Sequence, residues 1–228
     1  MTAVTRIAFP AVRAMTRDRN KGMTLRQIAW GSMCAFAIVV LVVAAWCFLI
    51  VADMSYNVFW PIRYALLLYF IGGAVALSCG TCGISQFWAS LRRRDVAVRG
   101  WVGRLYLMGV GVGAAGALSM SLHSVVGWTF GVATFFLGVV WVATTAMAYR
   151  SLRREYLHAH REWMLRSYIV TFSFVVFWLL VVSPAFAGAV LPQRLATFLW
   201  LSWSLPLLIN EMILQWRRSA ANGRVYFV

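Results

Sequence analysis

Two of the chain's three histidines lie in one short polar stretch, LHAHREWMLRSY, residues 157–168. The stretch also holds arginines, a glutamate and a tryptophan, side chains that bind metals, move protons or pair with charged ligands. On a helix, His158 and His160 point in different directions, because residues that share a face are three or four positions apart. The two histidines are therefore not expected to grip one ion. For His160 alone, three roles stay open: haem ligand, proton-handling group, or interfacial histidine in a basic loop.

A carboxylate far along the chain is the second candidate for chemistry. Glu211 lies within an apolar run, where a carboxylate is costly and is usually paired or functional. Its expected partners are Arg104 and Arg166, and Glu162 is also four residues from Arg166 and can pair with it. Two interpretations stay open for Glu211: a proton- or substrate-handling group in an inward-facing cavity, or an ion pair between helices or at the lipid interface.

Other motifs favour structure over catalysis. The CGTC sequence, Cys79 to Cys82, has thiol-exchange spacing, but it lies in an apolar run of small residues that favours helix packing. No Ser/His/acid set can be assembled, since His123 has only Asp53 as an acidic residue on its side. The sequence therefore leans against an enzyme, and it predicts no catalytic residue and no metal ligand. If there is an activity, we expect a transmembrane haem-dependent reductase.

The composition indicates that a bilayer surrounds these residues. Hydrophobic residues make up 62% of the 228 residues and charged residues 12%, whereas soluble domains have about 45–50% and about 25%. The formal charge of +15 would favour nucleic acid in a soluble protein. Here the basic residues are confined to short loops, so we expect no nucleic-acid partner.

Six apolar runs are long enough to span a membrane, which takes about 20 residues each. The sequence predicts an all-α integral membrane six-helix bundle over residues 28–216, between a basic N-terminal arm (1–27) and a tail (217–228). Small residues at intervals of four predict close helix contacts on two of these helices. The predicted spans are 28–52, 64–88, 105–122, 127–149, 167–191 and 196–216, and the small residues are Gly72, Ala76 and Gly80 on one helix and Gly109, Gly113 and Ala117 on the next.

The distribution of arginine and lysine predicts the orientation of this bundle. With six spans, 19 of the 21 basic residues fall on one side, and only Arg63 and Arg194 fall on the other. Because basic loops stay in the cytoplasm, both termini are expected inside (N-in/C-in), in the bacterial cytoplasmic membrane. The basic inner face is also expected to contact anionic lipids.

Three segments resemble a bacterial membrane-protein family known as domain of unknown function 2306. They are QFWASLRRRDVAVRGWVGRLY, GVVWVATTAMAYRSLRREYLHAHREWMLRSYIVTF and WLSWSLPLLINE, and the similarity covers about residues 64–215. The resemblance implies that one polar cluster is the site. Its members are Arg104, Tyr106, His160, Trp163, Arg166 and Glu211.

The likeness of this family to b-type cytochromes and ferric-reductase-like bundles would make His160 a ligand of haem b. The chain departs from the family pattern, because Arg99 stands where members carry a histidine and the 64–88 helix has none. Our first hypothesis is therefore a non-enzymatic membrane protein, transporter-like or an accessory subunit, with an inward cavity. The second is a b-type haem electron-transfer protein.

Overall fold

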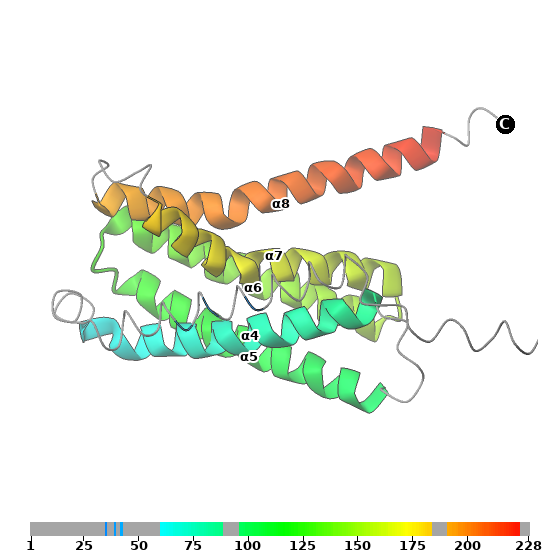
Figure 1. Ribbon diagram of the computed structural model, residues 1–228, viewed down its shortest axis with the longest axis horizontal. Helices are drawn as coiled ribbons and strands as arrows, with labels where there is room; N and C mark the ends of the chain where they lie inside the picture. Colours follow the sequence, from blue (N-terminus) through cyan, green and yellow to red (C-terminus); the bar gives the residue numbers. More distant parts are fainter. Residues whose placement is uncertain are drawn as a thin grey trace, which may run out of the picture.

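The protein is a bundle of long helices in the computed structural model, which describes Ala35, Val39, Val42 and residues 60–88, 96–183 and 191–223. Within these residues there is no strand, and the predicted all-α class is confirmed. Successive helices run in opposite directions along the long axis (Figure 1). After a short 3-10 helix, Trp60–Ile62, the elements are α4 (Arg63–Trp88), α5 (Val96–Leu122), α6 (Trp128–Arg153), α7 (Leu157–Val182) and α8 (Leu191–Gly223).

Each of the five long helices contains a segment that is long and apolar enough to cross a membrane. The predicted span 28–52 lies outside the described residues except for Ala35, Val39 and Val42, which are helical. The five described helices therefore account for five of the six predicted spans. The remaining span, residues 28–52, stays a prediction.

The helices extend further than the apolar runs that predicted the spans. α5 begins at Val96 and α7 at Leu157, whereas the apolar runs begin near residues 105 and 167. Hydropathy marks the part of a helix that suits lipid, while helix-forming residues such as Arg, Glu, Leu and Met continue the helix into the polar region. The stretch at 157–168 is therefore the first part of α7 and not a loop. The connection between α6 and α7 is short and includes Glu155, whose φ of 60° lies in the left-handed region.

Glycine faces bring α4 and α5 into backbone contact, as their spacing predicts. A Cβ atom added at Gly72 would lie 2.2 Å from the backbone nitrogen of Gly113, and one at Gly109 would lie 2.8 Å from that of Ala76. Ala76 and Ala117 are fully buried. Because only glycine lets two helix backbones approach this closely, these positions fix how the two helices pack.

The last helix follows the bundle for only part of its length. α8 packs on α6 and α7, and its C-terminal half then diverges from the other helices (Figure 1). Pro206 lies inside α8, and beyond it the side chains of Leu208, Met212 and Trp216 are more than half exposed. Among the described residues, this half of α8 makes few apolar contacts with the bundle, and it also makes polar contacts with α7.

Candidate functional site

A two-point ion pair joins α7 to the diverging half of α8. Arg166 Nε lies 2.5 Å from Glu211 Oε1, and Arg166 Nη2 lies 2.9 Å from Glu211 Oε2. The arginine side chain is 10% exposed and the glutamate side chain 38% exposed. A planar guanidinium facing a carboxylate in this way fixes both the distance and the orientation of its partner. Of the two partners expected for Glu211, the structure selects Arg166.

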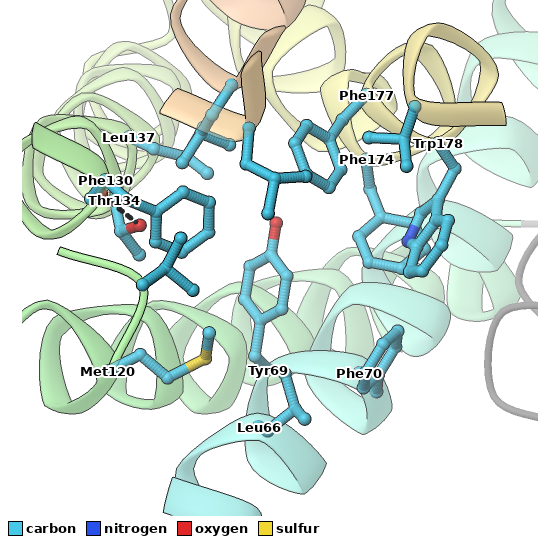
Figure 2. Close-up of a pocket in the computed structure, with 14 residues that line it drawn as sticks. Leu66, Tyr69, Phe70, Met120, Phe130, Thr134, Leu137, Phe174, Phe177 and Trp178 are labelled. Carbon is cyan, nitrogen blue, oxygen red and sulfur yellow. Dashed lines mark hydrogen bonds between the residues drawn. The ribbon is translucent and has the colours of Figure 1, made fainter. Parts of the chain in front are cut away.

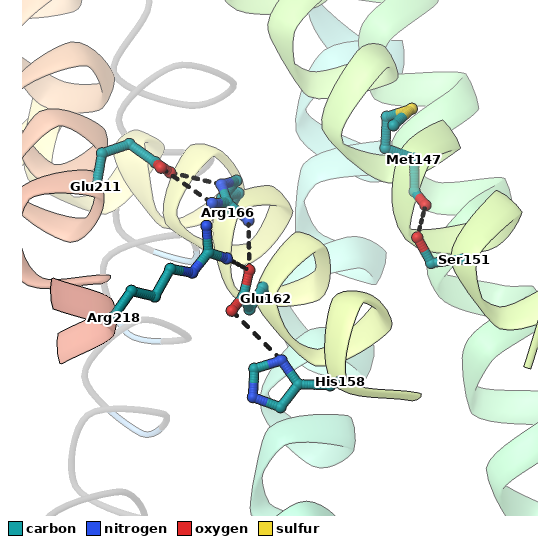
Figure 3. Close-up of polar contacts among 7 residues, drawn as sticks. All are labelled: Met147, Ser151, His158, Glu162, Arg166, Glu211 and Arg218. Atoms are coloured by element: carbon teal, nitrogen blue, oxygen red, sulfur yellow. Dashed lines mark hydrogen bonds and ion pairs between the residues drawn. The ribbon is translucent and has the colours of Figure 1, made fainter. Parts of the chain in front are cut away.

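Three further charged or titratable side chains extend this pair into what we call the charged cluster: His158, Glu162, Arg166, Glu211 and Arg218 (Figure 3). Glu162 Oε2 lies 3.7 Å from Arg166 Nη1, as predicted from their spacing, and Glu162 also pairs with Arg218 of α8. His158 Nδ1 lies 3.4 Å from Glu162 Oε1. With two carboxylates and two guanidinium groups, the cluster balances its charge, as charges within a membrane span require.

The helical repeat of α7 explains the geometry of the cluster. His158, Glu162 and Arg166 are four residues apart and therefore share one face of the helix. The ring of Trp163 lies 4.6 Å from the Arg166 guanidinium carbon, so the buried cation also contacts an aromatic face. Arg218 and His158 were not predicted to belong to the charged cluster. His158 lies four residues before Glu162, and this spacing alone predicts that the two side chains can meet. The contact of Arg218 with Glu162 depends on how α8 packs on α7.

His160 points away from this cluster, which confirms that the two histidines diverge. Its Nδ1 lies 2.8 Å from the carbonyl oxygen of Ala148, so the imidazole donates a hydrogen bond to α6. The chain's remaining histidine, His123, follows α5 at the opposite end of the bundle, where its Nδ1 lies 3.1 Å from the Ser119 carbonyl oxygen. No second histidine of the same chain can therefore face His160 across one haem.

Tyr106 belongs to a different group of side chains, which we call the hydroxyl network. Its hydroxyl lies 2.7 Å from Ser167 Oγ and 3.0 Å from Thr171 Oγ1. Trp141 Nε1 donates to Thr171 Oγ1 at 2.9 Å, and Thr145 Oγ1 lies 2.6 Å from Ser167 Oγ. All five residues are buried. The network ties α5, α6 and α7 together with hydrogen bonds that satisfy its polar groups inside the bundle.

Arg104 lies apart from both groups. It is exposed, and its guanidinium carbon lies 5.4 Å from the ring of Trp101, one turn earlier on α5. Of the six residues predicted to form one polar cluster, the structure brings Trp163, Arg166 and Glu211 together. It places Tyr106 in the hydroxyl network, His160 against α6 and Arg104 at the surface.

Residues 66–214, which carry the charged cluster's ion pair and the whole hydroxyl network, match the family model described as "Predicted membrane protein (DUF2306)". The chain belongs to this family. No curated protein and no solved structure matches it. Together with the five apolar helices, membership makes the chain a multi-pass membrane protein that contacts the lipid bilayer.

The two cysteines that the structure describes in this DUF2306 protein add no metal site. Cys79 and Cys82 lie on α4, the first half-buried and the second exposed. Within the described part of the chain, no three His, Cys, Asp or Glu side chains are placed to hold a metal ion. The charged cluster is the candidate functional site that the ion pairs between α7 and α8 define.

Proposed function

We propose that this protein is a non-enzymatic, transporter-like or accessory membrane protein in which the charged cluster is a gate between α7 and α8. The observation that carries the proposal is the Arg166–Glu211 pair, made by a guanidinium that is nearly buried within a membrane span. Charges at such depth are costly and mark functional sites by default. An ion pair serves no packing need that an apolar pair would not meet equally well.

The second carboxylate supports a gating role. Glu162 is on the same helix as Arg166, whereas Glu211 is on α8. If α8 swings away, Arg166 loses Glu211 but keeps Glu162, so opening does not leave a buried cation without a counter-ion. The released face of the guanidinium then fits a planar carboxylate of a small organic anion, because it bound Glu211 at two points. Small organic anions are the substrate class that we propose.

We further propose a six-helix, N-in/C-in topology in the bacterial cytoplasmic membrane, with the charged cluster facing the cytoplasm. Supporting this, the alternating helices put Arg63 and Arg194 at one end of the bundle and the arginine-rich α6–α7 connection at the other (Figure 1). Anionic lipids would bind the basic end, and we propose no nucleic-acid partner. In a chain without its native cysteines, Arg154→Cys should react with a membrane-impermeant maleimide only from the cytoplasmic side. Labelling from the outside would overturn the orientation.

Transport can be tested with proteoliposomes on a solid-supported membrane, exposed to jumps of a panel of small mono- and dicarboxylates. We expect at least one carboxylate to give a saturable transient current that is lost in Arg166→Gln and kept in Arg150→Gln. Arg150 is an exposed arginine of α6 and serves as the control for loss of positive charge. Currents equal to those of empty liposomes across the panel, or an unaltered current in Arg166→Gln, would contradict a transport role.

A b-type haem electron-transfer protein is the second candidate, favoured by the hydrogen bond from His160 Nδ1 to the Ala148 carbonyl. Histidines that bind metals through Nε2 commonly donate from Nδ1 in this way. The chain itself does not supply a second axial histidine near His160, so its residues do not fit a two-histidine haem within one protomer. An optical spectrum of protein expressed with ample haem tests this candidate. A Soret band that disappears in His160→Ala would support haem binding through His160, and a colourless folded protein would contradict it.

A further inference from the structure

The end of the bundle opposite the charged cluster contains an apolar cavity of about 300 Å³. It lies between the first turns of α4, α6 and α8 and the last turns of α5 and α7 (Figure 2). Aromatic side chains dominate its wall: Tyr69, Phe70, Phe130, Phe174, Phe177 and Trp178. Cavities of about this size, apolar with a few polar groups, are typical of small-molecule sites.

One hydroxyl group points into this cavity. Tyr69 projects from α4 with its phenolic oxygen toward the centre, between the residues of α6 and those of α7 (Figure 2). The other hydroxyl in the wall, of Thr134, already donates to the Phe130 carbonyl oxygen at 2.8 Å. A polar contact available to a ligand is thus the Tyr69 phenol, which can donate a hydrogen bond to it.

The surrounding packing holds the Tyr69 ring in place. Its ring lies 6.4 Å from that of Trp141 in an edge-on arrangement and 5.7 Å from that of Phe174. Its backbone nitrogen would lie 2.5 Å from a Cβ atom added at Gly116, so α5 supports this turn of α4 directly. A donor held this firmly is pre-organised, and little conformational entropy is lost when a ligand accepts its hydrogen bond.

We propose that this cavity binds the head group of a membrane-soluble quinone. A quinone ring is planar and stacks on aromatic side chains, and its carbonyl oxygen accepts a hydrogen bond from a phenol. An acyl chain would also fill an apolar cavity, but it would bury the Tyr69 hydroxyl without an acceptor, which is unfavourable. Tyr69 lies about 9 Å along α4 from Arg63, at 1.5 Å per residue, so the cavity is at a depth that a lipid-soluble molecule reaches from the bilayer.

The test is equilibrium binding of tritiated ubiquinone-2 to the purified full-length protein in nanodiscs. We expect saturable binding of one molecule per chain. Tyr69→Phe should weaken it about five-fold, the loss of one hydrogen bond. Tyr64→Phe, on the same helix but exposed and outside the cavity wall, should leave it unchanged. Absence of saturable binding to the wild-type protein, or equal binding by wild type and Tyr69→Phe, would overturn the proposal.

A cavity-filling variant separates binding here from binding elsewhere on the protein. Val126 is half-buried and lines the cavity from the α5–α6 connection. Val126→Trp should abolish ubiquinone-2 binding while the thermal unfolding temperature stays close to that of the wild-type protein. Undiminished binding to folded Val126→Trp would place the quinone at another site and overturn the proposal. So would a tightly held phospholipid that mass spectrometry finds in the protein and that ubiquinone-2 does not displace.

Discussion

Arg166 of α7 and Glu211 of α8 face each other across two nitrogen–oxygen contacts of 2.5 Å and 2.9 Å. The pair connects the bundle to the part of α8 that leaves it (Figure 1). Arg218, further along α8, returns to Glu162 of α7. Within the described residues, both ion pairs between these helices join a charged side chain of α7 to one of α8. They add electrostatic contacts along the C-terminal half of α8 to the apolar packing of α8 on α6 and α7.

The aromatic ring on Arg166 should stabilise the cluster measurably. Trp163→Leu removes a ring 4.6 Å from a nearly buried guanidinium, and we expect a loss of about 2 kcal/mol in the free energy of unfolding. Trp101→Leu is the matched control, because that ring contacts the exposed Arg104 and should cost about 0.5–1 kcal/mol or less. Denaturant titration in detergent measures both. Equal losses in the two variants would show that Trp163 acts through packing alone.

Two adjacent glycines of α4 should respond to alanine with opposite signs. Gly72→Ala places a Cβ atom 2.2 Å from the backbone of α5, which should cost about 1–3 kcal/mol or more through overpacking. Gly73→Ala meets nothing within 4 Å and should gain up to about 1 kcal/mol from helix propensity. Thermal unfolding of both variants checks the prediction. A stable Gly72→Ala protein would mean that α4 and α5 do not touch through this face.

The hydroxyl network should depend on its central serine. Ser167→Ala removes a group that contacts both Tyr106 and Thr145, and we expect a loss of about 1–2 kcal/mol, since each such contact in a membrane is worth about 0.6 and up to about 1.7 kcal/mol. Ser173→Ala is the control, because that buried hydroxyl bonds a carbonyl of its own helix, at Val170. Unfolding in detergent compares the two. A Ser167→Ala protein no less stable than Ser173→Ala would leave the network without a stabilising role.

Contacts set by spacing along one helix could be predicted from the sequence. The Glu162–Arg166 contact follows from the helical repeat. Small residues at every fourth position also predict which faces of α4 and α5 pack closely, but not that Gly72 meets Gly113. The pairing of Glu211 was predictable as a choice between two arginines, because a carboxylate within an apolar run needs a partner.

Contacts that depend on how separate helices pack could not be predicted. Nothing in the local pattern separates Arg166, which reaches Glu211, from Arg104, which rests on Trp101. Tyr106 and Arg104 are two residues apart and so face different directions on α5, which is why one joins the hydroxyl network and the other is exposed. The cavity at Tyr69 draws on all five long helices and on the α5–α6 connection, and hydropathy marks each helix as apolar without indicating where they meet.

A double-mutant cycle between Arg166→Gln and Glu211→Gln tests most directly whether this ion pair holds α8 to α7. The cycle compares the free energies of unfolding of the wild-type protein, the two single variants and the double variant. We predict a coupling of about 0.5–3 kcal/mol for this pair. The same cycle with Arg104→Gln in place of Arg166→Gln should give none. Zero coupling between Arg166 and Glu211, or equal coupling of Glu211 to Arg104, would show that this ion pair does not hold α8 to α7.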